Sequence, residues 1–188
     1  MAIELVDPDP TWARQFEEIG RWLRSAFGDR ALRIDHIGST AVPGLPAKDV
    51  IDVQLTVEQL EGVDGVLAGS AFAMRSGTVS DHRPSGSELP DRDLVKLFAE
   101  ASEPRRANLH VRQPGRFNQR YPLLCRDYLR AQRPAAQAYG EVKRQLARIV
   151  GDDVEAYYDV KDPVFDIVMA GAEAWGARTG WAPGPSDA

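Results

Sequence analysis

His36 to Val53 reads HIGSTAVPGLPAKDVIDV, and this stretch decides the fold. It begins at the end of a short alternating run, residues 32–37, which is typical of a strand. Residues 38–48 contain two glycines, two prolines, Ser and Thr, a composition that favours a turn or a short helical start. Residues 49–57 are rich in β-branched side chains and alternate again, which predicts a second strand. Two strands joined by such a turn indicate an α/β protein with its ligand site at the turn.

Hydrophobic spacing extends the pattern in both directions. We expect a mixed sheet of residues 32–37, 50–57, 94–98 and 107–112, flanked by helices at 10–27 and 58–67. Three helices should follow residue 117, the second with Ala138, Val142, Leu146 and Ile149 on one face. Asp152 with Glu155 resembles a capping box, and Asp162-Pro163 indicates the start of the final helix. The domain should cover residues 1–180, with the core sheet within 30–115, helices within 118–178 and a flexible tail at 181–188.

Composition restricts the class of protein. Apolar residues make up 43% and charged residues 27% of 188, the balance of a folded soluble protein. Cys125 is the sole cysteine, which excludes an intrachain disulfide and a thiolate metal cluster. The first residues resemble no secretory signal, and no segment approaches the apolar length that spans a bilayer. We therefore expect a cytoplasmic protein without a membrane partner.

Charge is unevenly distributed along the chain. The net charge is -5, yet residues 105–133 hold eight arginines and one acid, Asp127, and so carry +7 against -12 for the rest. Arginines bind anionic oxygens bidentately, so this segment could face a phosphate. The alternative is that the arginines pair with the surplus acids elsewhere. We expect no nucleic-acid partner, because the chain is acidic overall and the segment lacks interleaved aromatic residues.

The turn after the first strand carries the chemistry. Gly38, Ser39 and Thr40 place backbone N–H groups and two hydroxyls around one point, as a phosphate group requires. The next strand brings Asp52 toward that point, where its carboxylate could hold Mg²⁺. Ser39 and Asp52 are thus the candidate catalytic residues, and Asp52 is the candidate metal ligand.

These motifs also resemble a known family. HIGSTAVPGLPAK at residues 36–48 and VIDV at 50–53 look like the signature of the GrpB family. LHV at 109–111, CRDYLRA at 125–131 and YYDVKDP at 157–163 extend the likeness over essentially the whole chain. The family is similar in fold to the nucleotidyltransferase superfamily, and in some bacteria such a domain is fused behind dephospho-CoA kinase. The resemblance implies an α/β (α+β) fold: a nucleotidyltransferase-like mixed sheet flanked by helices, with a helical C-terminal half.

The superfamily pattern is incomplete in this sequence. Its second acid would stand two residues after Asp52, where this chain has Gln54, and a strand that should supply a third acid carries His110. Two-metal nucleotidyl transfer depends on clustered carboxylates. Catalysis with Mg²⁺ or another divalent metal is therefore one hypothesis. The other is a non-catalytic accessory module that works through a protein partner such as a coenzyme A biosynthetic enzyme.

Four further side chains are candidate phosphate ligands. His36 and His110 could join Asp52 around a metal or a phosphate, although a histidine on an apolar face is more often a core residue. Lys48 could reach a phosphate as a point charge or lie in solvent. Arg112 should share a strand face with His110. The leading hypothesis is a site that binds a nucleotide or another phosphorylated small molecule and that could also transfer a nucleotidyl group.

Overall fold

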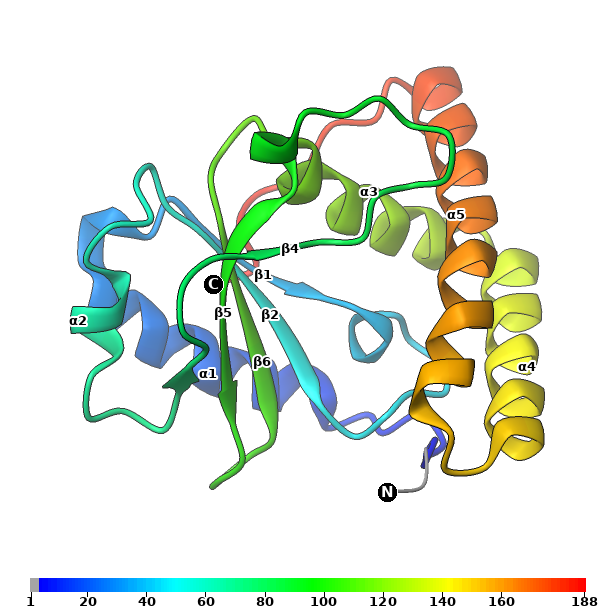
Figure 1. The fold of residues 1–188 in the computed structure, drawn as a ribbon, viewed down its shortest axis with the longest axis horizontal. Coiled ribbons are helices and arrows are strands. Elements are labelled where there is room, and N and C mark those ends of the chain that lie inside the picture. Colours follow the sequence, from blue (N-terminus) through cyan, green and yellow to red (C-terminus); the bar gives the residue numbers. More distant parts are fainter. Residues whose placement is uncertain (1–3) are drawn as a thin grey trace.

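A mixed sheet forms the centre of the protein in the computed structural model, which describes residues 4–188 (Figure 1). Its order is β1-β2-β6-β5-β3, and β4 pairs with β5 as well. The strands are β1 (Arg33–Ile37), β2 (Ile51–Thr56), β3 (Ala73–Met74), β4 (Val79–Ser80), β5 (Val95–Ala101) and β6 (Ala107–Arg112). β2 runs parallel to β6, while β1 is antiparallel to β2 and β5 to β6. The predicted mixed α/β fold and all four predicted strands are confirmed.

Helices lie on both sides of this sheet (Figure 1). They are α1 (Trp12–Phe27), α2 (Val63–Leu67), α3 (Phe117–Ala131), α4 (Arg133–Val150) and α5 (Val154–Thr179). The predicted first helix and the three helices of the C-terminal half are present. Within the described residues, no helix combines the length and the apolar character that crossing a membrane requires.

The alternation of β2 separates an apolar face from a polar one. Val53 and Leu55 are fully buried in a core cluster that also holds the inward side chains of α1 and α2. Burying each large aliphatic or aromatic side chain stabilises the fold by about 1.5–3 kcal/mol. Asp52 and Gln54 point the opposite way, because successive strand residues face opposite sides of a sheet. The polar face is the one that carries the site.

Two predicted helix boundaries are wrong. The helix expected at residues 58–67 covers only Val63–Leu67, because Gly62 precedes it in a left-handed conformation with φ of 72°. Asp162-Pro163 does not begin a helix, because α5 starts earlier and continues through Pro163. Contacts of α5 with both α3 and α4 hold the helix across this proline, which lacks a backbone N–H. The helix begins after Asp153, whose side chain accepts from the backbone N–H of Ala156.

The buried face of α4 also differs from the prediction. Val142 and Ile149 are exposed, whereas Tyr139, Lys143 and Leu146 point inward. Because the buried face contains Lys143, the spacing of apolar residues alone does not predict this face.

Residues 181–188, predicted as a flexible tail, return to the free edge of β1. The backbone N–H groups of Asp187 and Ala188 donate to the carbonyl of Ile34, and the Asp187 carboxylate accepts from the backbone N–H of His36. The unpaired hydrogen-bonding groups of an edge strand provide the partners that hold this segment.

Candidate ligand-binding site

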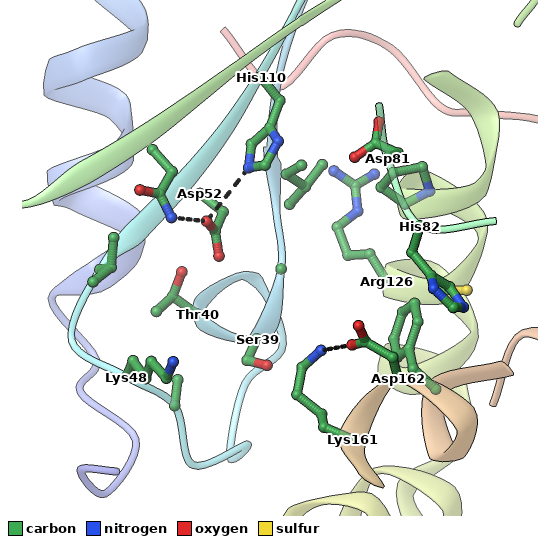
Figure 2. A pocket seen from close by; sticks show the side chains of 18 of the residues that line it. Ser39, Thr40, Lys48, Asp52, Asp81, His82, His110, Arg126, Lys161 and Asp162 are labelled. Carbon is green, nitrogen blue, oxygen red and sulfur yellow. Dashed lines mark hydrogen bonds and ion pairs between the residues drawn. The ribbon is translucent and has the colours of Figure 1, made fainter. Parts of the chain in front are cut away.

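A cavity of about 500 Å³ opens between the polar sheet face, the turn after β1 and the C-terminal helices. Figure 2 shows Asp52 and His110 on the strands, Ser39, Thr40 and Lys48 along the turn, and Lys161 and Asp162 on the opposite helix. Three segments far apart in sequence therefore meet at this point.

Gly38 shapes the turn. Its φ of 71° favours glycine, and a Cβ atom there would stand 2.3 Å from Oδ2 of Asp52. The carboxylate thus lies directly over the Gly38 backbone. Ser39–Ala41 then forms one turn of 3₁₀ helix, fixed by a 3.0 Å hydrogen bond between Thr40 Oγ1 and His36 Nε2.

Asp52 is held by two side chains of β6. Asn108 Nδ2 donates to its Oδ1 at 2.8 Å, and His110 Nε2 faces the same oxygen at 3.7 Å. Burial alone would raise the pKa of Asp52, but the interactions with His110 and Asn108 outweigh it and lower that pKa. Asp52 is therefore ionised near neutral pH, with 27% of its side chain exposed.

Lys96 on β5 fixes the state of His110. Its Nζ lies 2.8 Å from His110 Nδ1, which must accept because an ammonium group can only donate. Burial and the positive charges of Arg112 and Lys96 lower the pKa of His110 to about 4, against the opposing effect of Asp52. His110 is thus neutral at pH 7 and carries its proton on Nε2, toward Asp52.

Asp81, which follows β4, was missed in the sequence analysis because its segment shows no periodicity. It accepts hydrogen bonds from Nε and Nη2 of Arg112, from Lys96 and from Asn118. Burial would raise the pKa of Asp81, but Arg112 and Lys96 lower it to about 2. Asp81 is therefore the carboxylate that both buried cations behind His110 share.

The structure corrects two candidate phosphate ligands. His36 projects to the apolar face, where it is 4% exposed and stacks on Phe16 with ring centroids 4.8 Å apart. It does not line the cavity. Arg112 does line it but is only 2% exposed, and it binds Asp81 and the side-chain oxygen of Gln54. Both residues act as structural groups, because their hydrogen-bonding capacity is directed at the protein.

Five of the eight arginines in residues 105–133 pair with acids outside the segment, which supports the alternative interpretation. Arg112 and Arg126 are buried ion-pair partners, and the other pairs are nearer the surface. The pairs are Arg105–Asp49, Arg112–Asp81, Arg116–Asp93, Arg120–Glu173, Arg126–Asp127, Arg126–Asp187 and Arg130–Asp127.

Two lysines of the cavity differ from these arginines in their partners, which are neutral groups. Lys48 Nζ lies 3.0 Å from the hydroxyl of Tyr158 and 4.7 Å from the centre of its ring. Lys143 on α4, a residue missed in the sequence analysis, donates to Ser39 Oγ at 2.8 Å and to the carbonyl of Pro46 at 2.6 Å. Within residues 4–188, neither lysine forms an ion pair with a carboxylate.

The site does not fit a two-metal centre. Among residues 4–188, no three His, Cys, Asp or Glu side chains are grouped to hold a metal ion. Gln54 cannot replace the missing acid, because it is fully buried and its amide binds Arg112 and the carbonyl of Gln119. Asp52, the metal ligand predicted from the sequence, therefore lacks the grouped side chains that would hold an ion with it.

The family is decided by comparison. The model of the family described as GrpB protein matches residues 2–170. The chain belongs to the GrpB family. A crystal structure of the conserved protein GrpB from Enterococcus faecalis superposes with a TM-score of 0.71 at 28% identity, over 92% of this chain and 99% of that one. The GrpB fold predicted from the motifs is thus confirmed.

Two groups of GrpB relatives carry different names. A dephospho-CoA kinase of Mycolicibacterium paratuberculosis is 38% identical over 96% of this chain, and another of Mycobacterium leprae is 34% identical. This chain spans 48% of the length of each of those kinases. A UPF0157 protein of Halalkalibacterium halodurans is 33% identical over 92% of this chain and 84% of its own length.

Proposed function

We propose that the cavity binds a phosphorylated small molecule, with a nucleotide as the favoured class. The observation that carries this proposal is the charge of the cavity. Its lining has six basic side chains against three acidic ones, in a protein of net charge -5. The basic residues are Lys48, Lys96, Arg112, Arg126, Lys143 and Lys161, and the acids are Asp52, Asp81 and Asp162.

Most of these charges neutralise one another, which identifies the ones left for a ligand. Lys161 pairs with Asp162 at 2.7 Å, and the buried arginines and Lys96 have carboxylate partners. Lys48 ends the turn that contains Ser39, and Lys143 donates to Ser39 Oγ, yet among residues 4–188 neither lysine has such a partner. A phosphate group would supply the missing negative charge by charge-assisted hydrogen bonds.

Aromatic side chains favour a ligand with a flat or apolar part. Tyr139, Tyr157, Tyr158 and Phe165 line the same cavity as the two lysines. Ligand pockets commonly combine such apolar walls with a few placed polar groups, and a nucleobase matches that combination. The names of the dephospho-CoA kinase relatives support a coenzyme A-related ligand or partner as part of this proposal.

Nucleotidyl transfer through Ser39 and Asp52 has weaker support. One ionised carboxylate with a neutral histidine and an asparagine beside it is a poor match for two Mg²⁺ ions. This specific observation favours the second candidate function, an accessory module that retains the binding site without catalysis.

Thermal unfolding with a panel of ligands tests the proposal. The panel contains pyrophosphate, ADP, ATP and a 3′-phosphorylated nucleotide, each with and without Mg²⁺ or Mn²⁺. A ligand that binds the native state at 100 times its Kd adds about 2.7 kcal/mol of stability. Lys48→Met should reduce that gain, whereas Arg148→Met, at an exposed position of α4, should leave it unchanged.

The measurements with and without Mg²⁺ or Mn²⁺ distinguish metal-assisted catalysis from a non-catalytic accessory module. A gain that depends on the ion and disappears in Asp52→Asn supports metal-assisted catalysis. An equal gain without metal supports the accessory module. If no phosphorylated compound raises the unfolding temperature, the proposed ligand class is refuted.

A further inference from the structure

Lys143 is the exceptional cation of this protein. Among residues 4–188, four lysine and arginine side chains are buried: Lys96, Arg112, Arg126 and Lys143, the last only 3% exposed. The first three have carboxylate partners within 3 Å. Lys143 instead donates to two neutral oxygens, those of Ser39 and Pro46. A buried charge without a counter-charge is costly, so an apolar residue would be the more stable choice at this position.

The fold brings Lys143 to the turn by close packing. Gly140 stands one helical turn before it, and a Cβ atom there would lie 2.9 Å from Pro46 Cδ. The absence of a side chain lets α4 approach the turn closely enough for the ammonium group to reach Ser39. The ring of Tyr139 lies 4.9 Å from the same nitrogen and covers it. Lys143 is thus positioned from three directions.

We propose that Ser39 and Lys143 form the subsite for a doubly charged phosphate group, and that binding there places a proton on Lys143. This inference rests on the proposed function of the cavity and identifies where the phosphate lies. The Ser39 hydroxyl and Lys143 both line the cavity and contact each other, so one oxyanion can interact with both. The ligand then provides the counter-charge that the protein lacks.

The surrounding charges explain the proton. Burial, together with repulsion from Lys161 and Arg144, lowers the pKa of Lys143 to about 7, although Asp52 opposes the shift. A bound dianion raises that pKa again, so binding takes up a proton at pH values above 7. The charged groups that act on Lys143 are Arg144 on α4, Lys161 on α5 and Asp52 on β2, and the Tyr139 ring covers its Nζ. Lys48, Tyr157 and Tyr158 line the same cavity.

The histidines of the core take up no proton in the pH range used to test this inference. His36 and His110 are both neutral above pH 6, because burial lowers the pKa of each to about 4. His82 lines the cavity and binds Asp166, so the experiment is repeated with His82→Gln.

Sulfate is the probe, since it stays a dianion at every pH used. Isothermal titration calorimetry at pH 6 and pH 8 should give a Kd that is about tenfold higher at pH 8, from loss of the Lys143 proton. Titrations at pH 8 in two buffers of different ionisation enthalpy should show uptake of nearly one proton per sulfate. Lys143→Met should bind weakly at both pH values, and Arg148→Met should match the wild type.

Each other outcome has a definite meaning. Binding of equal strength at both pH values without proton uptake overturns the inference, and so does sulfate binding retained in Lys143→Met. Failure of sulfate to bind at pH 6 overturns it as well. In these cases the ligand panel still decides the proposed function, which fails only if no phosphorylated compound binds. Ser39→Ala supplies a second variant: an unchanged Kd at pH 6 removes Ser39 from the subsite.

Discussion

Lys143→Met should alter how the stability of the protein depends on pH. In the unfolded chain Lys143 has an ordinary lysine pKa, 10.5, whereas in the folded protein burial lowers it to about 7. Between these values the unfolded state binds more protons, so the free energy of unfolding increases with pH. The sign follows from burial: the folded protein is destabilised as long as Lys143 is charged and is relieved of that cost as it deprotonates.

The titration of Lys143 changes the free energy of unfolding most clearly between pH 6 and pH 9. From pH 6 to pH 9 the unfolded chain keeps the proton and the folded chain loses it near pH 7. The integrated difference is about two pH units, which corresponds to about 2.7 kcal/mol at 1.36 kcal/mol per unit. The wild type should therefore gain about 2.7 kcal/mol more stability over this interval than Lys143→Met. Lost hydrogen bonds to Ser39 and Pro46 also affect the variant, but equally at both pH values.

Urea unfolding at pH 6 and pH 9 gives the change in the free energy of unfolding for each protein, and the two changes are then compared. Groups that titrate elsewhere contribute equally to both proteins and cancel. Arg148→Met serves as the control, because it removes an exposed charge from the same helix. The m-values should agree, since the surface exposed on unfolding is nearly the same. If wild type and Lys143→Met change stability in parallel between the two pH values, Lys143 is not an uncompensated buried cation and the reasoning is wrong.

Two further variants test the structural roles assigned above. Arg112→Ala should cost about 3–5 kcal/mol in urea unfolding, because it leaves the buried Asp81 carboxylate without its main partner; a loss below about 1 kcal/mol would return Arg112 to the ligand site. Gly38→Ala should cost about 1–3 kcal/mol more than Gly44→Ala. Both glycines have positive φ, but only at Gly38 does the new Cβ meet Asp52, so equal losses would disprove the close contact.

Local sequence was sufficient for much of the sheet. The alternation in residues 32–37, 50–57 and 107–112 predicted β1, β2 and β6 within one or two residues. The signal is strong because each strand buries one side, and a shift by one residue would place its apolar side chains in solvent. The same alternation placed Asp52 on the polar face, and the glycine-led turn placed Ser39 at the end of β1.

Helix boundaries were less predictable than strands, in one case because of a local backbone conformation and in another because of tertiary contacts. Gly62 delays α2 through its own backbone conformation, a signal present in the sequence but outweighed by the apolar pattern around it. Pro163 normally begins a helix, yet α5 continues through it because α3 and α4 pack along its length. Tertiary contacts can thus override a local preference.

The sequence by itself determined the apolar core, the strands and the motif that marks the ligand site. Only the tertiary structure decided which charges remain for a ligand. Arg112 looked available until Asp81, 31 residues earlier, proved to bind it, and Lys143 became a candidate only because α4 packs on the turn. The physical reason is that the energy of a charge depends on its neighbours in space and on its burial, and neither is written in the periodicity of the chain.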